Sequence, residues 1–349
     1  MRVIALQDFY FLLVVALIQG VTLCSSRTLR EFVVRAIAAI AYQLSDMKRR
    51  LIEKNLSRAF AGKLGEDQKH GIIKGAFYEF WQELFLGALS KAENVEVREA
   101  RIHGLAHLHG ALKMGKGVIL WESNGFGRRL LAKRILSENG FLIHQIHGAN
   151  DLGGFLTENG SATWVRRRLI RRFFYRREER FVVEIINLPS ANSLEFTRVL
   201  LNLLNRNAVL CVSGDGRTGQ KLIPIEFLGE ATLFAPGMIS LAKLSGAPIL
   251  PMFCLQKRTG AISLTIESPI SIAKDADRER GLKDSLKEYA GLLEGYIRRY
   301  PQLYRNWHLL GKCSNDGVQK AAASERSREM REDEARSSLS ENRNAGEQF

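Results

Sequence analysis

The chain has 349 residues, a hydrophobic fraction of 46% and a formal net charge of +14. This length and apolar content support a real core, in one large α/β domain or two small ones. The basic balance favours a negatively charged partner such as nucleic acid, phosphorylated substrates or an anionic membrane face. The cysteines form no CxxC pair, which excludes a zinc or redox signature of that kind.

The first predicted element is an apolar run over residues 9–24. A spanning helix needs about 20 apolar residues, and we predict a membrane anchor over residues 1–28. A buried or interfacial helix stays open as an alternative. Leu23 before Cys24 argues against a lipoprotein site, and the lack of a small-residue cleavage site argues against a removed signal peptide. The basic residues after the run place the bulk of the chain in the cytoplasm by the positive-inside bias.

Helices are expected next. Apolar residues recur at steps of three and four over residues 29–60, and a further helix is expected from about Asp67. We therefore predict an N-terminal helical segment over residues 29–95.

The pattern then alternates between strands and helices. Strands are expected at 117–121, 141–146, 181–188, 208–213, 249–255 and 261–267, and helices at 129–139, 194–204 and 238–244. This order predicts an α/β domain over residues 96–312, with a central, mostly parallel or mixed sheet flanked by helices. Residues 313–349 are polar and charged, and we interpret them as a disordered tail.

Five segments along the chain carry a family pattern. They are Lys48–Phe60, which ends in NLSRAF; Ile102–Leu108 with Gly115–Leu120; Val209–Gly216 with its continuation to Gly237; Leu241–Pro251; and Tyr300–His308. In this order, over roughly residues 1–312, they resemble the late (lauroyl and myristoyl) acyltransferases of lipid A biosynthesis, within the lysophospholipid acyltransferase superfamily.

The resemblance implies a glycerolipid acyltransferase-like fold and a defined chemistry. A fatty acyl chain passes from acyl-ACP or acyl-CoA to a lipid or glycolipid hydroxyl, as in lipopolysaccharide synthesis, on the cytoplasmic face of a bacterial inner membrane. No metal or bound cofactor is needed. A His at the end of a strand is the general base, and an acid five residues later orients that His.

This sequence departs from the family at that pair. Aligning Gly117–Leu120 with the family strand places Asn124 at the His position and Arg129 at the acid position. The Asn amide cannot take up a proton, and Arg cannot act as a counter-anion. No histidine has an acid five residues on; His147, with Asp151 four residues on, is the nearest case.

Glu122 is the candidate substitute, because residues two apart on a strand share a face and Glu122 would then lie beside Asn124. It is either a base with a pKa raised by burial or the partner of Arg129 in an ion pair that fixes the loop. Ser123 has the chemistry of a nucleophile, but the sequence shows no base for it. Asp215 and Arg217 lie in a glycine-rich turn, which is either part of the cleft or an ordinary turn.

A basic stretch from Arg166 to Arg180 is interleaved with aromatic residues. It fits an anionic lipid surface, glycolipid phosphates, an acidic carrier protein or a solvated helical face. We expect no nucleic acid, because of the predicted anchor.

The hypothesis from sequence is an acyltransferase-like membrane protein. Its candidate catalytic residues are Glu122, Asn124, Arg129 and Asp215, and its candidate substrate-binding residues are Ser123, His147, Arg166 and Arg217. The alternative is a catalytically inactive relative that acts as a lipid-binding or scaffold protein. A transferase that moves another group with a different base is a third possibility.

Overall fold

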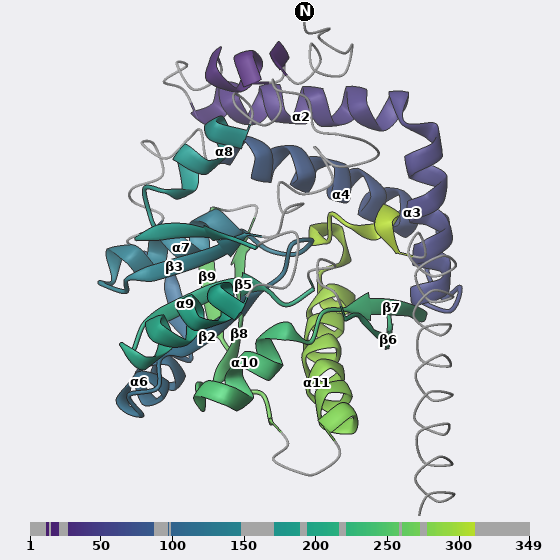
Figure 1. Cartoon of the computed structure of the whole chain (residues 1–349). Coiled ribbons are helices and arrows are strands. Elements are labelled where there is room, and N and C mark those ends of the chain that lie inside the picture. Colours follow the sequence, from purple (N-terminus) through teal and green to yellow (C-terminus); the bar gives the residue numbers. More distant parts are fainter. Residues whose placement is uncertain are drawn as a thin grey trace, which may run out of the picture.

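A computed structural model describes residues 12–13, 15–20, 27–86, 97, 99–147, 171–188, 194–215, 221–257, 260–272 and 278–310. Its centre is a seven-stranded sheet with the order β1-β9-β8-β2-β5-β3-β4 (Figure 1). The strands of this sheet are β1 (Arg101–His103), β2 (Val118–Glu122), β3 (Ile143–His147), β4 (Glu184–Asn187), β5 (Val209–Ser213), β8 (Ile249–Gln256) and β9 (Ile262–Ile266). The expected α/β fold with a mixed central sheet is confirmed.

The direction of the strands decides where polar side chains gather. Strands β8, β2, β5, β3 and β4 run parallel, whereas β9 is antiparallel to β8. The carboxyl ends of β2, β5, β3 and β4 therefore share one edge of the sheet. Ligands of open α/β sheets bind outside the carboxyl ends of the strands, which makes this edge the first place to look for a site.

Helices cover both faces of the sheet. They are α6 (Leu105–Lys113), α7 (Arg129–Glu138), α8 (Arg171–Glu178), α9 (Leu194–Asn205), α10 (Gly237–Ser245) and α11 (Arg278–Arg299). Strand β2 is buried at every position, as is typical of a central parallel strand. Its Val118 and Leu120 pack in a cluster with α6 and α7, and Ile119 and Trp121 pack with α9, α10 and α11. Glu122 continues the first of these two faces.

The expected N-terminal helical segment is present, but it consists of more helices than predicted. The helix expected over residues 29–60 is two helices, α2 (Arg27–Leu44) and α3 (Asp46–Ala59), and Ser45 separates them. Asp46 is an acidic residue in the first turn of α3, where the helix dipole favours negative charge. Helix α4 (Glu66–Leu86) packs against α2, with Trp81 and Phe85 of α4 in one cluster with Val34 and Ala38 of α2. Figure 1 shows α2 and α4 as a layer at one end of the molecule, with α3 running from this layer along one side toward β6 and β7. We call α2 and α4 the helical layer.

Smaller elements complete the fold. Strands β6 (Ile223–Phe227) and β7 (Glu230–Phe234) form an antiparallel pair beside α11, and two 3₁₀ turns, η2 (Pro301–Leu303) and η3 (Trp307–Leu309), end the described part of the chain. Sequence periodicity did not identify β1, β6, β7, α6, α8 or α11. The expected tail, residues 313–349, lies outside the described residues.

The expected membrane anchor falls mostly outside the described residues as well. Of its 28 positions, the structure describes 12–13, 15–20, 27 and 28. Ile18 is fully buried, in the same cluster as Val34 and Trp81. Within the described parts of the chain, no helix is both long enough and apolar enough to cross a membrane.

Candidate functional site at the carboxyl edge of the sheet

The turn over residues 123–128, between β2 and α7, is held by its own polar side chains. Ser123 Oγ donates to Asp215 Oδ2 at 2.6 Å and accepts from the backbone N–H groups of Gly125 and Phe126 at 3.2 and 3.1 Å. Asp215 Oδ1 also accepts from the N–H of Asn124 at 2.7 Å. Burial raises the pKa of Asp215, although these hydrogen bonds act against the increase. Ser123 and Asp215, two separate candidates from sequence, are thus in direct contact, and together they fix the turn.

Two buried arginines attach this turn to the rest of the fold. Arg305 donates to the carbonyl oxygens of Gly127 at 2.6 Å and Asn124 at 3.0 Å. Arg128 forms an ion pair with Glu79 of α4 at 2.6 Å. Gly127 has a φ of +75°, and an added Cβ would lie 2.7 Å from the Cys254 carbonyl oxygen, so a residue without a side chain is required there. The helical layer is therefore packed directly over the turn.

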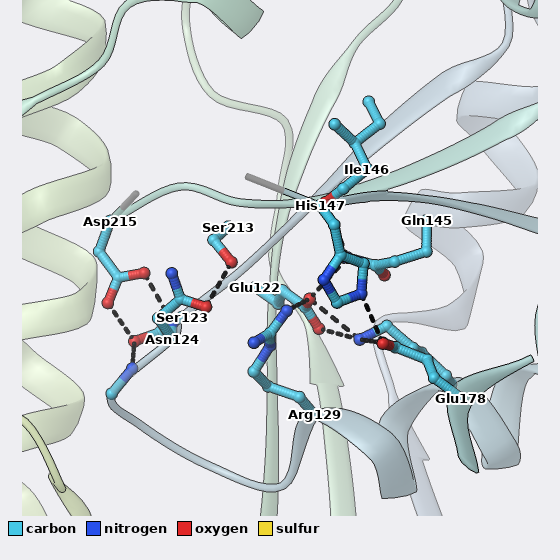
Figure 2. Close-up of polar contacts among 12 residues, drawn as sticks. Glu122, Ser123, Asn124, Arg129, Gln145, Ile146, His147, Glu178, Ser213 and Asp215 are labelled. Carbon is cyan, nitrogen blue, oxygen red and sulfur yellow. Dashed lines mark hydrogen bonds and ion pairs between the residues drawn. The ribbon is translucent and has the colours of Figure 1, made fainter. Parts of the chain in front are cut away.

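Asn124 and Arg129 do not form a pair. The Asn124 side-chain Oδ1 accepts from Ser213 Oγ, at the end of β5, at 2.8 Å. Arg129 instead reaches Glu122 Oε1 at 2.6 Å. Figure 2 shows the two side chains turned toward different partners. The positions that the resemblance assigns to the family's dyad are thus occupied by members of two separate polar groups.

Glu122 is buried and forms ion pairs with two cations. Besides Arg129, it accepts from Lys133 Nζ at 2.8 and 3.0 Å and from Gln145 Nε2 at 3.2 Å. Burial alone raises the pKa of Glu122, but Arg129 and Lys133 outweigh burial and lower it to about 2. Of the two alternatives for Glu122, the structure has the ion pair. A carboxyl group with so low a pKa is a poor acceptor of a proton at neutral pH.

The charged group continues from Lys133 to a histidine. Lys133 Nζ also contacts Glu178 Oε1 of α8 at 2.7 Å, and Glu178 Oε2 lies 2.6 Å from His147 Nε2 at the end of β3. Burial raises the pKa of Glu178, but Lys133 and His147 outweigh burial and lower it well below its ordinary value. Glu122 and Glu178 carry the negative charges of this cluster, and Arg129 and Lys133 form ion pairs with them. Arg177 of α8 is a further cation whose charge interacts with that of Glu178. Figure 2 shows Glu122, Arg129, His147 and Glu178 close together.

Sequence reasoning did not identify six of these side chains: Glu79, Lys133, Gln145, Glu178, Ser213 and Arg305. A signal existed for Lys133, because a residue four positions after Arg129 lies on the same face of a helix. Glu178 lies 31 residues from His147, and no local spacing rule connects them. Of the predicted substrate-binding residues, Arg166 and Arg217 lie outside the described residues, as does Asp151.

The fold and this edge define an α/β protein with a polar site where the parallel strands end. The family model described as bacterial lipid A biosynthesis acyltransferase matches residues 127–309, slightly more than half of the chain. The chain belongs to this family. The match begins just after Asn124, so it includes Arg129 but not the position at which the resemblance places the His.

Curated relatives are distant. A phosphatidylinositol mannoside acyltransferase of Mycobacterium tuberculosis (strain CDC 1551 / Oshkosh) is 26% identical over 186 residues, which cover 51% of this chain and 52% of the relative. Its namesake in Mycolicibacterium smegmatis is 26% identical over 213 residues, which cover 58% of this chain and 62% of the relative. The chain thus spans roughly half to three-fifths of the curated relatives it matches.

Proposed function

We propose that this protein transfers a fatty acyl chain from an acyl thioester, acyl-ACP or acyl-CoA, to a hydroxyl group of a membrane lipid or glycolipid. The observation that carries the proposal is the family match, which spans β3, β4 and β5 of the polar carboxyl edge and helices α7 and α8, although β2 precedes it. Both relatives are phosphatidylinositol mannoside acyltransferases, which supports a lipid or glycolipid acceptor here. No cofactor or metal is part of the proposal.

The helical layer supports a membrane location for this reaction. Four large apolar side chains on the outer face of α2 are exposed, Leu29 at 47%, Phe32 at 67%, Ile40 at 59% and Leu44 at 81%. We call them the α2 stripe. The opposite face of α2 packs on α4, and α4 holds the turn after β2 through Arg128. Helices α2 and α4 lie together at one end of the molecule (Figure 1). Because α4 contacts the turn after β2, we infer that an acceptor lipid reaches the carboxyl edge from this end.

This arrangement is the basis for the proposed location at the cytoplasmic face of a bacterial inner membrane. An exposed apolar helix face on a chain with a net charge of +14 suits an anionic lipid surface, which attracts the chain and then takes up the apolar side chains. The anchor expected within residues 1–28 is a separate proposal for attachment, and deletion of that segment tests it.

The test of the activity uses the purified full-length chain on vesicles that contain bacterial lipid extract. Acyl-ACP and acyl-CoA are supplied in separate reactions, and mass spectrometry follows the lipids. The expected result is an acceptor whose mass increases by one acyl chain, less the hydrogen that it loses, together with release of the free thiol. An unchanged lipid profile with both donors, from a chain that is folded and vesicle-bound, would overturn the proposal.

The second candidate is a lipid-binding or scaffold protein without catalysis. The observation that favours it is the loss of the family pair at Asn124 and Arg129, whose side chains belong to separate hydrogen-bonded groups. Under this alternative, lipid is retained by the protein but no thiol is released. Measuring both quantities on one sample separates the two functions.

A further inference from the structure

His147 and Glu178 form a His–carboxylate pair at the carboxyl edge, two strands away from the position of the family pair. Strand β5 lies between β2 and β3 in the sheet. The pair is nevertheless joined to the β2 end, because Lys133 contacts both Glu178 and Glu122. The side chains labelled in Figure 2 place His147, Glu178, Glu122 and Arg129 in one group. The pair therefore belongs to the same site as the turn after β2.

The partners of Glu178 determine which nitrogen of His147 carries the proton. Glu178 is held as a carboxylate by Lys133, and a carboxylate only accepts hydrogen bonds. His147 Nε2, 2.6 Å away, must therefore be the N–H donor. In the neutral imidazole the other nitrogen, Nδ1, then has a free lone pair. This is the tautomer that a general base requires.

Nδ1 of His147 has no hydrogen-bond partner among the described residues, although His147 is only 3% exposed. A buried acceptor without a donor is unfavourable, and such an atom in a native fold calls for an explanation. A substrate hydroxyl group is a donor of the required kind. Gln145 Oε1, two residues earlier on the same face of β3, is likewise buried without a donor. The site thus has two acceptor atoms on one face of β3, His147 Nδ1 and Gln145 Oε1, that receive no hydrogen bond from the described residues.

We propose that His147 is the general base of the acyl transfer and that Glu178 positions it. The inference rests on the acyltransferase function proposed above. The acceptor hydroxyl oxygen attacks the carbonyl carbon of the acyl thioester while its proton passes to His147 Nδ1. The carbon–sulfur bond then breaks, the ester forms, and the proton returns from Nδ1 to the leaving thiolate, which departs as the free thiol.

Aromatic and charged side chains surround His147 and determine which charges offset that of its ring. The ring of Tyr175, on α8, lies 5.0 Å from the His147 ring, measured between centroids. Lys133 and Arg129 of α7 are cations of the cluster, and Glu122 of β2 forms ion pairs with both. Arg177 of α8 is a third cation, and its charge interacts with that of Glu178. Glu178 would therefore offset the positive charge of the protonated imidazole during the reaction. The resemblance implies the same role for the acid that follows the family's His.

The chain offers a matched control on the same strand. His144 also contacts a glutamate, with its Nδ1 2.8 Å from Glu184 Oε1, and that glutamate side chain is 49% exposed. Because residues three apart on a strand point to opposite faces, His144 does not face the α7 and α8 cluster. His144→Gln therefore removes a His–Glu contact of β3 without touching the proposed base.

The experiment measures acyl transfer by the wild-type chain and by His147→Gln, Glu178→Gln and His144→Gln. We expect His147→Gln to lower kcat by about 100-fold or more, as loss of a general base does, and His144→Gln to leave kcat within about twofold. Glu178→Gln keeps an oxygen that accepts from Nε2 but removes the charge. We therefore expect it to lower kcat with KM unchanged, and Glu178→Asp to restore part of the rate.

The pH profile of kcat provides a readout that a structural role would not give. The profiles of the wild type and of His147→Gln should differ in shape, because a general base contributes its own protonation to the rate and a structural residue does not. If His147→Gln does not fold, the wild-type profile and Glu178→Gln decide the assignment. If the wild type transfers acyl chains and both His147→Gln and Glu178→Gln retain its rate, the role of His147 is overturned but the proposed function is not. No transfer by the wild type overturns the proposed function, and the assignment of His147 with it.

Discussion

Glu122 lies two residues before the position of the family's base, but its surroundings are those of a structural anion. Arg129 and Lys133 both end on its carboxylate, at 2.6 and 2.8 Å, and the side chains of Glu122 and Lys133 are 2% and 0% exposed. Removing one member of a buried ion group leaves the remaining charges without compensation in a low-dielectric interior. Glu122 should therefore contribute to stability more than to proton transfer.

Glu122→Gln should lower the free energy of unfolding at pH 7 by about 3–5 kcal/mol, since it leaves Arg129 and Lys133 undercompensated. Urea unfolding followed by circular dichroism measures the change. Glu226→Gln, at an exposed position of β6, is the control and should change the stability by less than about 0.5 kcal/mol. A Glu122→Gln protein as stable as the wild type would contradict the interpretation of the cluster.

The effect of Glu122→Gln should also depend on pH. The folded-state pKa of Glu122 is depressed from the ordinary 4.5 to about 2, so its stabilising contribution is present above pH 4.5 and is lost as the pH falls toward 2. The shift corresponds to roughly 3 kcal/mol. The stability difference between wild type and variant should therefore shrink over this acid range, and unfolding curves at stepwise lower pH would show it.

Restoring the family pair by substitution should fail for the same reason. Asn124→His with Arg129→Glu would place a second carboxylate where Arg129 now neutralises Glu122. We expect the double variant to be less stable than Asn124→His alone by about 3 kcal/mol or more, with no gain in acyl transfer. Thermal unfolding and the lipid assay measure the two effects. A double variant that is both stable and faster than wild type would show that the reacting group lies at position 124.

At this scale, sequence reasoning succeeded only for contacts that a local rule connects. The Glu122–Arg129 ion pair was one of two alternatives from sequence, because the two residues flank a single turn. The His147–Glu178 contact joins residues 31 positions apart, and a search at the family's five-residue spacing cannot find it. The pairing depends on how α8 packs against the edge of the sheet, which is tertiary information.

Among the elements, the strands with continuous apolar runs were predicted closely. The run at 117–121 became Val118–Glu122, and the run at 249–255 became Ile249–Gln256. Strands β1, β6 and β7 were missed. Strand β1 has only three residues, and β6 and β7, joined by the turn at Gly229, contain Pro224, Glu226 and Glu230 in place of a continuous apolar run. Helix α11 was also missed. Its charged residues dilute the apolar face that packs on the sheet.

Helix α2 leads to a prediction about membrane contact. Phe32→Glu with Ile40→Glu places two charges in the α2 stripe, whereas the buried face of α2 stays intact. We expect the vesicle-bound fraction to fall by about tenfold or more, because the apolar area can no longer enter the interface. Co-sedimentation with anionic vesicles measures it.

The control for this prediction is Leu142→Glu with Leu244→Glu. These side chains are 71% and 69% exposed, so the same charges are added without entering α2. Unchanged binding in this control, with loss in the α2 variant, would localise the contact. Equal binding by both variants would show that α2 does not meet the lipid.

For the whole molecule, the family could be inferred from sequence while the location of the chemistry could not. The order of segments from Lys48 to His308 was enough to suggest the family that the comparison shows. The mixed sheet followed from alternating strands and helices. The departure at Asn124 was visible, but the polar group on β3 and α8 forms only when the parallel strands bring their carboxyl ends together.

The net charge of +14 gives the last prediction, on how salt affects membrane attachment. Attraction between the basic chain and anionic lipid is screened over about 10 Å at 0.1 M salt, whereas burial of the α2 stripe is not screened. We therefore expect binding to anionic vesicles to weaken steeply with added salt and to level off above zero. The Phe32→Glu, Ile40→Glu variant should lose this salt-resistant remainder and keep the steep part. Co-sedimentation across a salt series separates the two contributions, and a remainder that survives in the variant would assign the apolar contact to another part of the chain.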